Sequence, residues 1–343
     1  MAPIKVLVVD DSLLTQEIIT VIFDSEEEIE VIGVANNGFE ALEFLEAEKP
    51  DFITMDISMP KMDGMEAIEK IMAKNPIPIL VISDVTDSKV AFVALTHGAL
   101  EVLPKSWLQP EKASELIAKI KLLSKVKVIR HIGTKPEVKN ENNGSDQTND
   151  APQFDHIVSI ACSTGGPKAL SAILSNLPPF FPFPILVSQH IDAEFVESLI
   201  DFLNDASPLR ILKGKEGESP QAGMAYISPG NKHMTVDNLG LISLVEPEPG
   251  EIYHPSCDRL LSSVAETFGD KSIGIILTGM GSDGAEGMQN IKNVGGQTIA
   301  QDEETSVIFG MPSVAIEKKC VDHVLPLQKI SPFLINLSKN QDQ

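Results

Sequence analysis

Acidic and basic side chains follow a series of short aliphatic runs in the first third of the chain. Asp10 and Asp11 end one run and Asp56 ends another, while Ser83 and Lys105 end two later runs. If the runs are parallel strands, their carboxyl ends share one edge of a sheet, so these side chains gather there. Three clustered carboxylates need a cation, and hard oxygen ligands suit Mg²⁺. The pattern predicts phosphoryl chemistry at Asp56, although an acidic pair alone is more typical of a helix cap.

A second set of reactive side chains lies in the latter half of the chain. Ser163, His190 and Asp283 each follow an aliphatic run. Ser163 precedes a segment with helical spacing, so the positive end of a helix would face it and stabilise an oxyanion. Histidine can accept the serine proton near neutral pH, and a carboxylate can orient the histidine. Together the three predict a hydrolase, although Ser163 alone fits a phosphate-binding turn or a helix cap, and His190 alone fits a structural role.

The glycine-rich run at residues 279–284 supports a competing interpretation. Its spacing is G-x-G-x-x-G, and Asp302 follows about twenty residues later, as in dinucleotide-binding motifs. The run comes late in its domain instead of at the first strand-helix turn, and it leaves the serine and histidine without a role. We favour the hydrolase, in which these glycines let backbone N–H groups near Met280 face an oxyanion. Cys162, at the end of an apolar run, is interpreted as a buried side chain and not as a nucleophile.

Two series of strands alternating with helices must position these side chains. Such alternation predicts right-handed crossovers and parallel sheets, and continuous apolar strands indicate that both faces are covered. The first series consists of Ile4–Val9, Val31–Ala35, Phe52–Met55, Ile79–Ile82 and Glu101–Leu103. The second consists of Ile157–Ala161, Ile185–Ser188, Met224–Ile227, Ser272–Leu277 and Thr298–Ala300, with a hairpin around Lys232–Val245. We therefore predict a five-stranded parallel domain at 1–124, a flexible linker at 125–154 and a doubly wound α/β domain with some antiparallel content at 155–343.

Composition excludes several classes of function. The formal net charge is −22, which disfavours nucleic acid as a partner because its phosphates need a basic surface. No apolar stretch approaches the roughly 20 residues of a membrane helix, so no membrane insertion is expected. Three cysteines do not suggest a disulfide framework, which favours a reducing cytoplasm.

The segments VLVVDDS, TMDISMPKMDG, VIS and LPK resemble the receiver domain of two-component response regulators, over residues 4 to about 122. The resemblance implies a flavodoxin-like fold in which Asp56 takes a phosphoryl group from a histidine kinase. It also implies that Asp11, Asp56 and the Ser58 carbonyl bind Mg²⁺, with Asp10 helping through water. Ser83 and Lys105 would be the residues that respond to phosphorylation and transmit the switch. The sequence departs from the usual receiver pattern at Pro104 and Ser106, which flank the lysine, and at Asp84.

The segments ACSTGGPKAL, SQHIDAEF, AYISPGNKHM, ILTGMGSDGA and VIFGMP resemble the catalytic domain of bacterial chemotaxis protein-glutamate methylesterases, from about residue 155 to 325. The resemblance implies a Ser163–His190–Asp283 triad, an oxyanion hole that includes the Met280 N–H, and no cofactor for ester hydrolysis. The implied substrates are glutamate methyl esters, and glutamines for deamidation, on chemoreceptor cytoplasmic domains. The run His254–Asp258 stands where Arg-Pro-Ser-Val-Asp is usual, and Ile-Asp follows the histidine where Met-Pro is usual.

The two domains together predict regulation of the hydrolase. The unphosphorylated receiver would cover Ser163, and phosphorylation at Asp56 would relieve the block. Two alternatives remain at this point: a receiver joined to a catalytically silent binding domain, and a nucleotide-dependent enzyme. A DNA-binding domain is the commonest partner of a receiver, but the acidic charge of the second half disfavours it.

Overall fold

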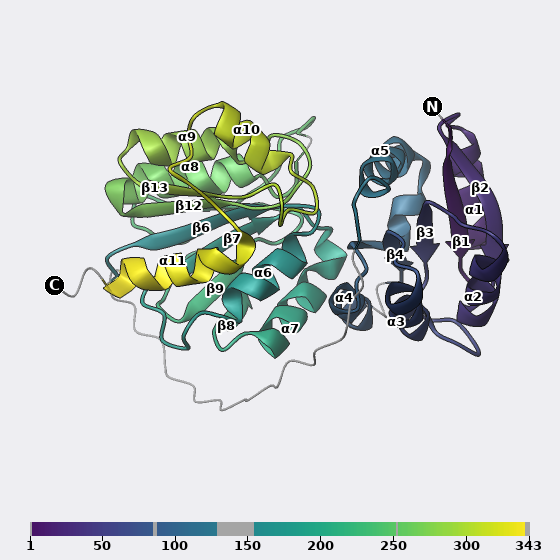
Figure 1. The fold of residues 1–343 in the computed structure, drawn as a ribbon. Coiled ribbons are helices and arrows are strands. Elements are labelled where there is room, and N and C mark those ends of the chain that lie inside the picture. The colour runs from purple at the N-terminus through teal and green to yellow at the C-terminus, as the bar shows by residue number, and fades with distance from the viewer. Residues whose placement is uncertain (1, 85–87, 129–153, 252, 340–343) are drawn as a thin grey trace. The chain divides into compact units, whose positions relative to one another are not determined.

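The computed structural model describes residues 2–84, 88–128, 154–251 and 253–339 of the 343-residue chain. The chain divides into two compact units, Met1–Lys135 and Pro136–Gln343 (Figure 1). Most of the predicted linker at 125–154 lies outside the described residues. Within the described residues, no helix combines the length and the apolar character needed to cross a membrane.

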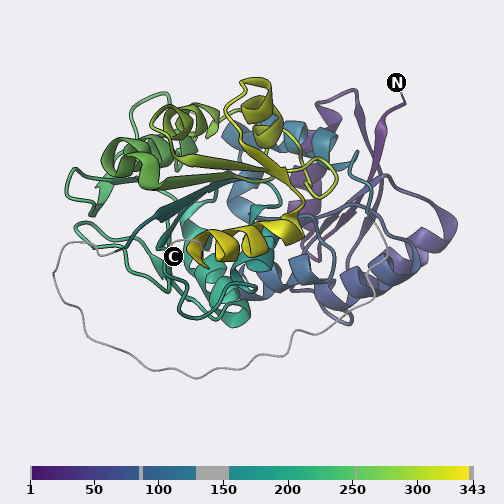
Figure 2. The ribbon, with the colours of Figure 1, turned by 60° about the vertical axis from the view of Figure 1, so that its left-hand side comes forward.

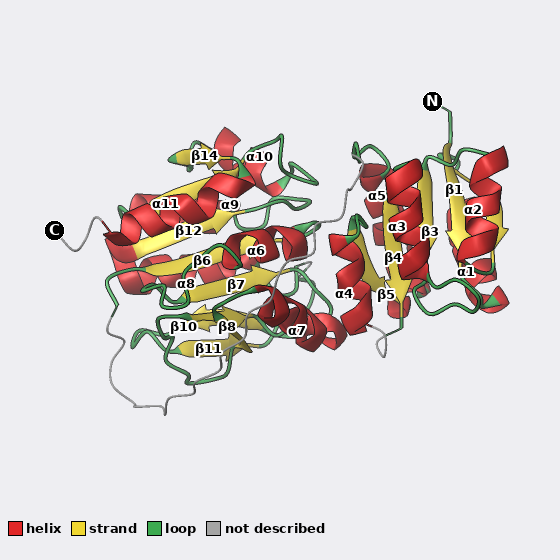
Figure 3. Cartoon of the chain, turned by 60° about the horizontal axis from the view of Figure 1, so that its bottom comes forward, coloured by secondary structure: helices red, strands yellow, loops and turns green. Residues whose placement is uncertain are grey.

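The first unit is a five-stranded sheet with the strand order β2-β1-β3-β4-β5, in which all neighbouring strands are parallel. The strands are β1 (Ile4–Val9), β2 (Ile29–Ala35), β3 (Phe52–Met55), β4 (Ile79–Ser83) and β5 (Glu101–Pro104). The helices are α1 (Leu13–Asp24), α2 (Gly38–Ala47), α3 (Gly64–Lys74), α4 (Ser88–Thr96) and α5 (Ala113–Leu123). Helix α1 packs beside α5, whereas α2, α3 and α4 pack in sequence, so the sheet lies between two helical layers (Figure 3).

The second unit is a seven-stranded sheet, again parallel between all neighbours, with the order β14-β13-β12-β6-β7-β9-β8. Its strands are β6 (Ile157–Cys162), β7 (Ile185–Gln189), β8 (Arg210–Lys213), β9 (Met224–Ile227), β12 (Ser272–Ile276), β13 (Gln297–Gln301) and β14 (His323–Leu325). A separate antiparallel hairpin consists of β10 (His233–Val236) and β11 (Ile242–Val245). The predicted α/β architecture with antiparallel content is therefore confirmed.

Helices cover both faces of the second sheet, as two views of the ribbon show (Figures 1 and 2). Helices α6 (Gly166–Leu174), α7 (Val196–Ala206) and α11 (Leu327–Lys339) form one layer, and α8 (Cys257–Phe268), α9 (Ala285–Asn293) and α10 (Met311–Glu317) form the other. Both layers bury aliphatic side chains against the central strands, which is why β6, β7 and β12 are buried along their whole length.

Candidate functional site

Three carboxylates meet at one edge of the first sheet. Strand β1 pairs with β3 so that Val9 lies opposite Met55, which places the next residues of each strand, Asp10 and Asp56, side by side. One oxygen each from Asp10, Asp11 and Asp56 lies within 4.8 Å of the others. Asp10 and Asp56 are buried and Asp11 is exposed. The donors are all hard oxygens, so the set fits the Mg²⁺ that the sequence predicts.

Lys105 neutralises part of this acidic cluster. Its ammonium group lies 2.8 Å from Asp56 Oδ2 and 3.0 Å from Asp10 Oδ2, and 3.8 Å from the more exposed Asp84. Burial raises the pKa of Asp56 to about 6, against the opposing effect of the Lys105 hydrogen bond. Burial alone would lower the pKa of Lys105, but its bonds to Asp56 and Asp10 outweigh this and raise it.

The unusual Pro104 does not displace the lysine. Pro104 ends β5, which is an edge strand, so the proline removes no ladder hydrogen bond that a further strand would need. Ser83 ends the neighbouring strand β4, is fully buried, and has a hydroxyl without a hydrogen-bond partner within the described residues. Ser58 lies in the exposed turn after Asp56. One edge of the first sheet thus carries all the residues that the sequence predicts for the phosphoryl and metal site.

His190 and Asp283 form the centre of the site in the second unit. His190 directly follows β7, and its Nε2 lies 2.7 Å from Asp283 Oδ2. Because an ionised carboxylate only accepts hydrogen bonds, Nε2 carries the proton and Nδ1 is left as the basic nitrogen. Tyr253 stacks on the imidazole, with ring centroids 5.1 Å apart and an interplanar angle of 13°. The structure therefore brings the predicted base and its orienting carboxylate together.

Asp283 is held by the N-terminus of α8. Its Oδ2 accepts from the backbone N–H of Cys257 at 2.6 Å, and its Oδ1 accepts from the N–H of Asp258 at 2.9 Å and from Ser256 Oγ at 3.1 Å. Helix N-termini favour negative charge. Burial acts to raise the pKa of Asp283, but the His190 bond and these donors outweigh it and lower the pKa.

Ser163 lies on the adjacent strand end. It follows β6, which pairs with β7, and the His190 N–H donates to Cys162 O at 3.0 Å. The turn after Ser163 needs glycine, because Gly165 has φ of 79° and a Cβ there would lie 2.7 Å from a Val307 methyl carbon. Within the described residues we find no hydrogen bond from the Ser163 hydroxyl to His190. The predicted nucleophile is thus at the same sheet edge as the other two residues, and its hydrogen bond to the base stays a prediction.

Gln189 connects the serine and histidine segments, and sequence reasoning missed it. Its buried amide nitrogen donates to Ser163 O at 2.9 Å and to His190 O at 2.8 Å. Its amide oxygen has no hydrogen-bond partner within the described residues, and a Cβ on Gly166 would lie 1.9 Å from it. The only sequence signal was that the apolar strand Ile185–Val187 continues into the polar pair Ser188 and Gln189.

The glycine-rich run packs against protein atoms. A Cβ on Gly279 would lie 2.8 Å from Ser163 Cβ, and one on Gly281, where φ is 90°, would lie 2.5 Å from the Tyr253 hydroxyl. The Asp302 carboxylate accepts from the N–H and hydroxyl of Thr305 and so caps a turn. The glycines therefore bring this backbone, including the half-exposed Met280, up to the serine. That arrangement favours an oxyanion site over the dinucleotide alternative.

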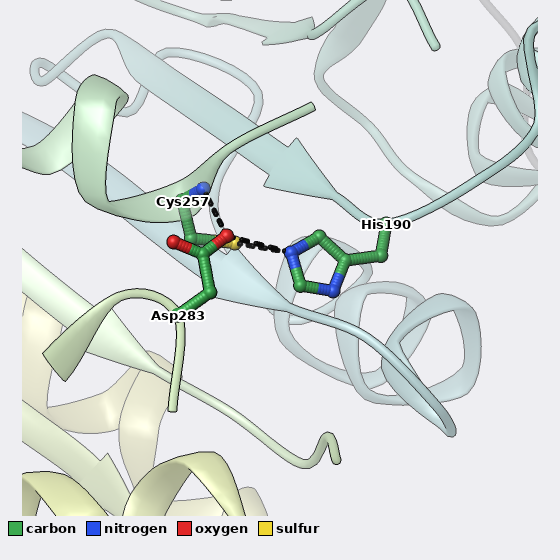
Figure 4. Close-up of side chains that lie close together, drawn as sticks. All are labelled: His190, Cys257 and Asp283. Atoms are coloured by element: carbon green, nitrogen blue, oxygen red, sulfur yellow. Dashed lines mark hydrogen bonds and ion pairs between the residues drawn. The ribbon is translucent and has the colours of Figure 1, made fainter. Parts of the chain in front are cut away.

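The cysteine next to Ser163 is a core residue. Cys162 is fully buried, and burial raises the pKa of its thiol. Its thiol points to Ser188 O at 3.9 Å. Cys257 is also fully buried, but its sulfur lies 3.5 Å from His190 Nε2, beside the hydrogen-bonded pair of His190 and Asp283 (Figure 4). Sequence spacing gave no sign of this contact.

The fold and these two sets of side chains define the class: a response-regulator receiver joined to a hydrolase domain built on a parallel, helix-covered sheet. Comparison with known families agrees. The response regulator receiver domain matches residues 6–121, and CheB methylesterase matches residues 158–334. The chain belongs to the CheB methylesterase family.

Relatives match over nearly the whole chain. A protein-glutamate methylesterase/protein-glutamine glutaminase of Paramagnetospirillum magneticum is 39% identical, over 98% of this chain and 96% of its own length. One of Pyrococcus abyssi is 38% identical, over 97% of this chain and 93% of its own. The CheB methylesterase catalytic domain of Thermotoga maritima is 41% identical with a TM-score of 0.51, covering 53% of this chain and 98% of that structure.

Proposed function

We propose that this chain hydrolyses methyl esters of glutamate side chains on chemoreceptors, and deamidates receptor glutamines by the same acyl chemistry. The observation that carries the proposal is the His190–Asp283 pair, fixed at 2.7 Å beside the strand end that bears Ser163. The names of the relatives support the substrate class. Three free, buried cysteines support a reducing, cytoplasmic location.

The reaction proceeds in two steps on this chain's own residues. His190 Nδ1 takes the Ser163 hydroxyl proton as the oxygen attacks the ester carbonyl, and the collapse of the tetrahedral intermediate releases methanol. A glutamyl-serine ester remains, and His190 then activates a water that releases the carboxylate. Asp283 stays ionised throughout and stabilises the imidazolium, because four hydrogen-bond donors surround its two oxygens.

The Met280 backbone N–H is the proposed oxyanion donor. Two contacts support it: Gly279 packs on Ser163, and Ser163 N–H donates to Thr278 O at 3.1 Å, so the strand end before Met280 runs beside the nucleophile. Removing one such donor in comparable enzymes lowers the rate by roughly 10²–10³.

Asp56 is the proposed phosphoryl acceptor, with a histidine kinase as donor. Asp10, Asp11, Asp56 and the Ser58 carbonyl would hold Mg²⁺, which supplies positive charge against the incoming phosphoryl oxygens. Lys105, already bonded to Asp56, pairs with those oxygens, and the unpartnered Ser83 hydroxyl is a donor for one of them. We further propose that phosphorylation at Asp56 relieves a block on Ser163.

The decisive experiment measures methanol release from methylated receptor, with and without Mg²⁺ and a small-molecule phosphodonor. Ser163→Ala should lower methanol release at least about 10³-fold while Asp56 still takes up the phosphoryl group. Retained esterase activity in this variant would refute the assignment of the nucleophile. Circular dichroism checks that the second unit of the variant is folded, because phosphorylation reports only on the first unit.

A further inference from the structure

The catalytic pair has a third neighbour that the proposed hydrolysis does not use. His190 Nε2, the Cys257 thiol sulfur and an Asp283 oxygen all lie within 4.8 Å of one another (Figure 4). Imidazole, thiolate and carboxylate are the ligands that bind zinc in proteins, and three protein ligands leave a fourth position open. We propose that His190, Cys257 and Asp283 form a site for a thiophilic divalent cation such as Zn²⁺, and that the bound cation inhibits hydrolysis.

The distances suit a tetrahedral ion after a small movement. With zinc bonds of about 2.0–2.3 Å, tetrahedral nitrogen and sulfur ligands stand roughly 3.6 Å apart, and nitrogen and oxygen ligands roughly 3.4 Å. The observed separation of His190 Nε2 from Cys257 Sγ is 3.5 Å, which already fits. Its separation from Asp283 Oδ2 is 2.7 Å and must widen. The ion would take the place of the proton that the histidine now shares with the aspartate.

The second ligand layer is also present. Asp283 is bonded to two backbone N–H groups and to Ser256 Oγ, so it stays in place when its bond to His190 is replaced. The Cys257 thiol now donates to Ser188 O at 3.3 Å, which directs its sulfur beside the imidazole. Such contacts orient ligands and strengthen metal binding. His190, the least buried of the three, provides the approach for the ion.

Inhibition follows from the proton balance. A neutral imidazole that binds an ion through Nε2 carries its single proton on Nδ1, so it cannot accept the Ser163 proton. On binding, the Nε2 proton moves to Nδ1 and the Cys257 thiol loses its proton to solvent, so one proton is released per ion. No redox step or further reactant is needed.

The cation class is set by the sulfur ligand. Thiolate and imidazole select Zn²⁺ and Cd²⁺ over Mg²⁺, whereas the carboxylates of the first unit favour Mg²⁺. The two sites therefore bind different ions. The inhibitory site can be tested in the unphosphorylated full chain without Mg²⁺.

The first test is a Zn²⁺ titration of methanol release, and it rests on the proposed function for its readout. Each variant is normalised to its own rate in chelator, because the Cys257 backbone also holds Asp283. Cys257→Ala should need at least about tenfold more Zn²⁺ for half inhibition. The matched control is Cys320→Ala, a buried cysteine whose thiol donates to Ala315 O at 3.0 Å, which should remain as sensitive as the unchanged chain. Equal inhibition of both variants would overturn the proposal.

The second test is independent of activity. Cd²⁺ added to the full chain should give a thiolate charge-transfer absorption, present in Cys320→Ala and absent in Cys257→Ala. Carboxylates cannot produce this band, so binding at Asp56 does not interfere. If Cys257→Ala does not fold, Cys257→Ser and His190→Gln replace it, and both should lose the band. A band that persists in these variants, or is missing from the unchanged chain, refutes the site. A chain with the band but no methanol release would instead refute the proposed hydrolysis.

Discussion

The two central carboxylates, Asp56 and Asp283, are equally buried, yet their surroundings move their pKa values in opposite directions. Asp56 is 4% exposed and Asp283 3%. Burial raises the pKa of Asp56 to about 6, whereas the pKa of Asp283 is lowered despite burial. The difference lies in the number of donors. Asp56 accepts from the Ile57 N–H and from Lys105, with Asp10 nearby, while Asp283 accepts from four donors.

This difference matches the two tasks. An aspartate that must form a bond to phosphorus needs free lone pairs. Its positive partner, here the Lys105 ammonium group, must be able to move from the carboxylate to the phosphoryl oxygens. An aspartate that must remain an anion beside an imidazolium needs its lone pairs filled by fixed dipoles. In the proposed mechanism the first site binds an exchangeable Mg²⁺ ion, whereas the second site is held by backbone N–H groups at the N-terminus of α8.

The substitution with the largest expected effect in this comparison of Asp56 and Asp283 is Asp283→Asn. The amide keeps the size of the side chain but has only one acceptor oxygen, and it no longer favours the proton on His190 Nε2. We expect kcat for methanol release to fall by about 10⁴-fold. Phosphorylation at Asp56 should be unchanged because Asp56 lies in the other unit, and circular dichroism checks that the second unit still folds. A loss below tenfold would mean that Asp283 does not orient the base.

The next test is removal of the first carboxylate. Asp56→Asn should abolish the stimulation of methanol release by a phosphodonor, which we expect to be about 5–150-fold in the unchanged chain. Chelation of Mg²⁺ should have the same effect on the unchanged chain. Basal methanol release should persist in both cases, because the proposed hydrolysis uses only Ser163, His190 and Asp283. Stimulation that survives in Asp56→Asn would place the acceptor elsewhere.

The sequence predicted the central strands and the reactive side chains for one physical reason. Strands covered on both faces, such as β3 and β6, are continuous apolar runs, and polar residues that follow them must lie at a common edge. Two edge strands were missed. β8 (Arg210–Lys213) is charged at both ends and β14 (His323–Leu325) has three residues, so neither has a detectable period.

The supporting residues of the hydrolytic site could not be predicted. Tyr253 and Cys257 contact His190 from the connection between β11 and α8 and from the start of α8, more than sixty residues along the chain. Their places depend on how α8 packs against β6 and on which backbone N–H groups Asp283 reaches. Spacing along a sequence does not encode such contacts between distant loops.

Two glutamines with similar roles offer a third test. Gln189 donates to the carbonyls of Ser163 and His190, and Gln16 donates to Asp10 O at 2.6 Å. Gln189→Leu should lower methanol release about tenfold by misplacing the catalytic segments, with phosphorylation unchanged. Gln16→Leu should slow phosphorylation and spare basal hydrolysis. If either substitution affects both reactions equally, the glutamine stabilises the fold generally and does not position one site.

The smallest expected effect concerns Asp258, which lies in the first turn of α8 and connects it to the first turn of α9. Its backbone N–H donates to Asp283, and its own carboxylate accepts from Gly287 N–H of α9 at 2.8 Å. Burial raises the pKa of Asp258 from 3.8 to about 6, and the Gly287 bond opposes this. A carboxyl with a raised pKa contributes stability below about pH 4 that is lost as the pH rises through about 6.

Asp258→Asn removes that ionisation but keeps an acceptor for Gly287. Relative to the variant, the unchanged chain should therefore lose unfolding free energy between about pH 4 and 6, by on the order of 1 kcal/mol after allowance for solvent screening at this half-buried group. Denaturant unfolding followed by circular dichroism measures it. The only tryptophan, Trp107, is in the first unit, so its fluorescence transition should not shift. A difference that is constant with pH, or that grows toward pH 7.5 in favour of the unchanged chain, would show that Asp258 is ionised without penalty and resembles Asp283 more than Asp56.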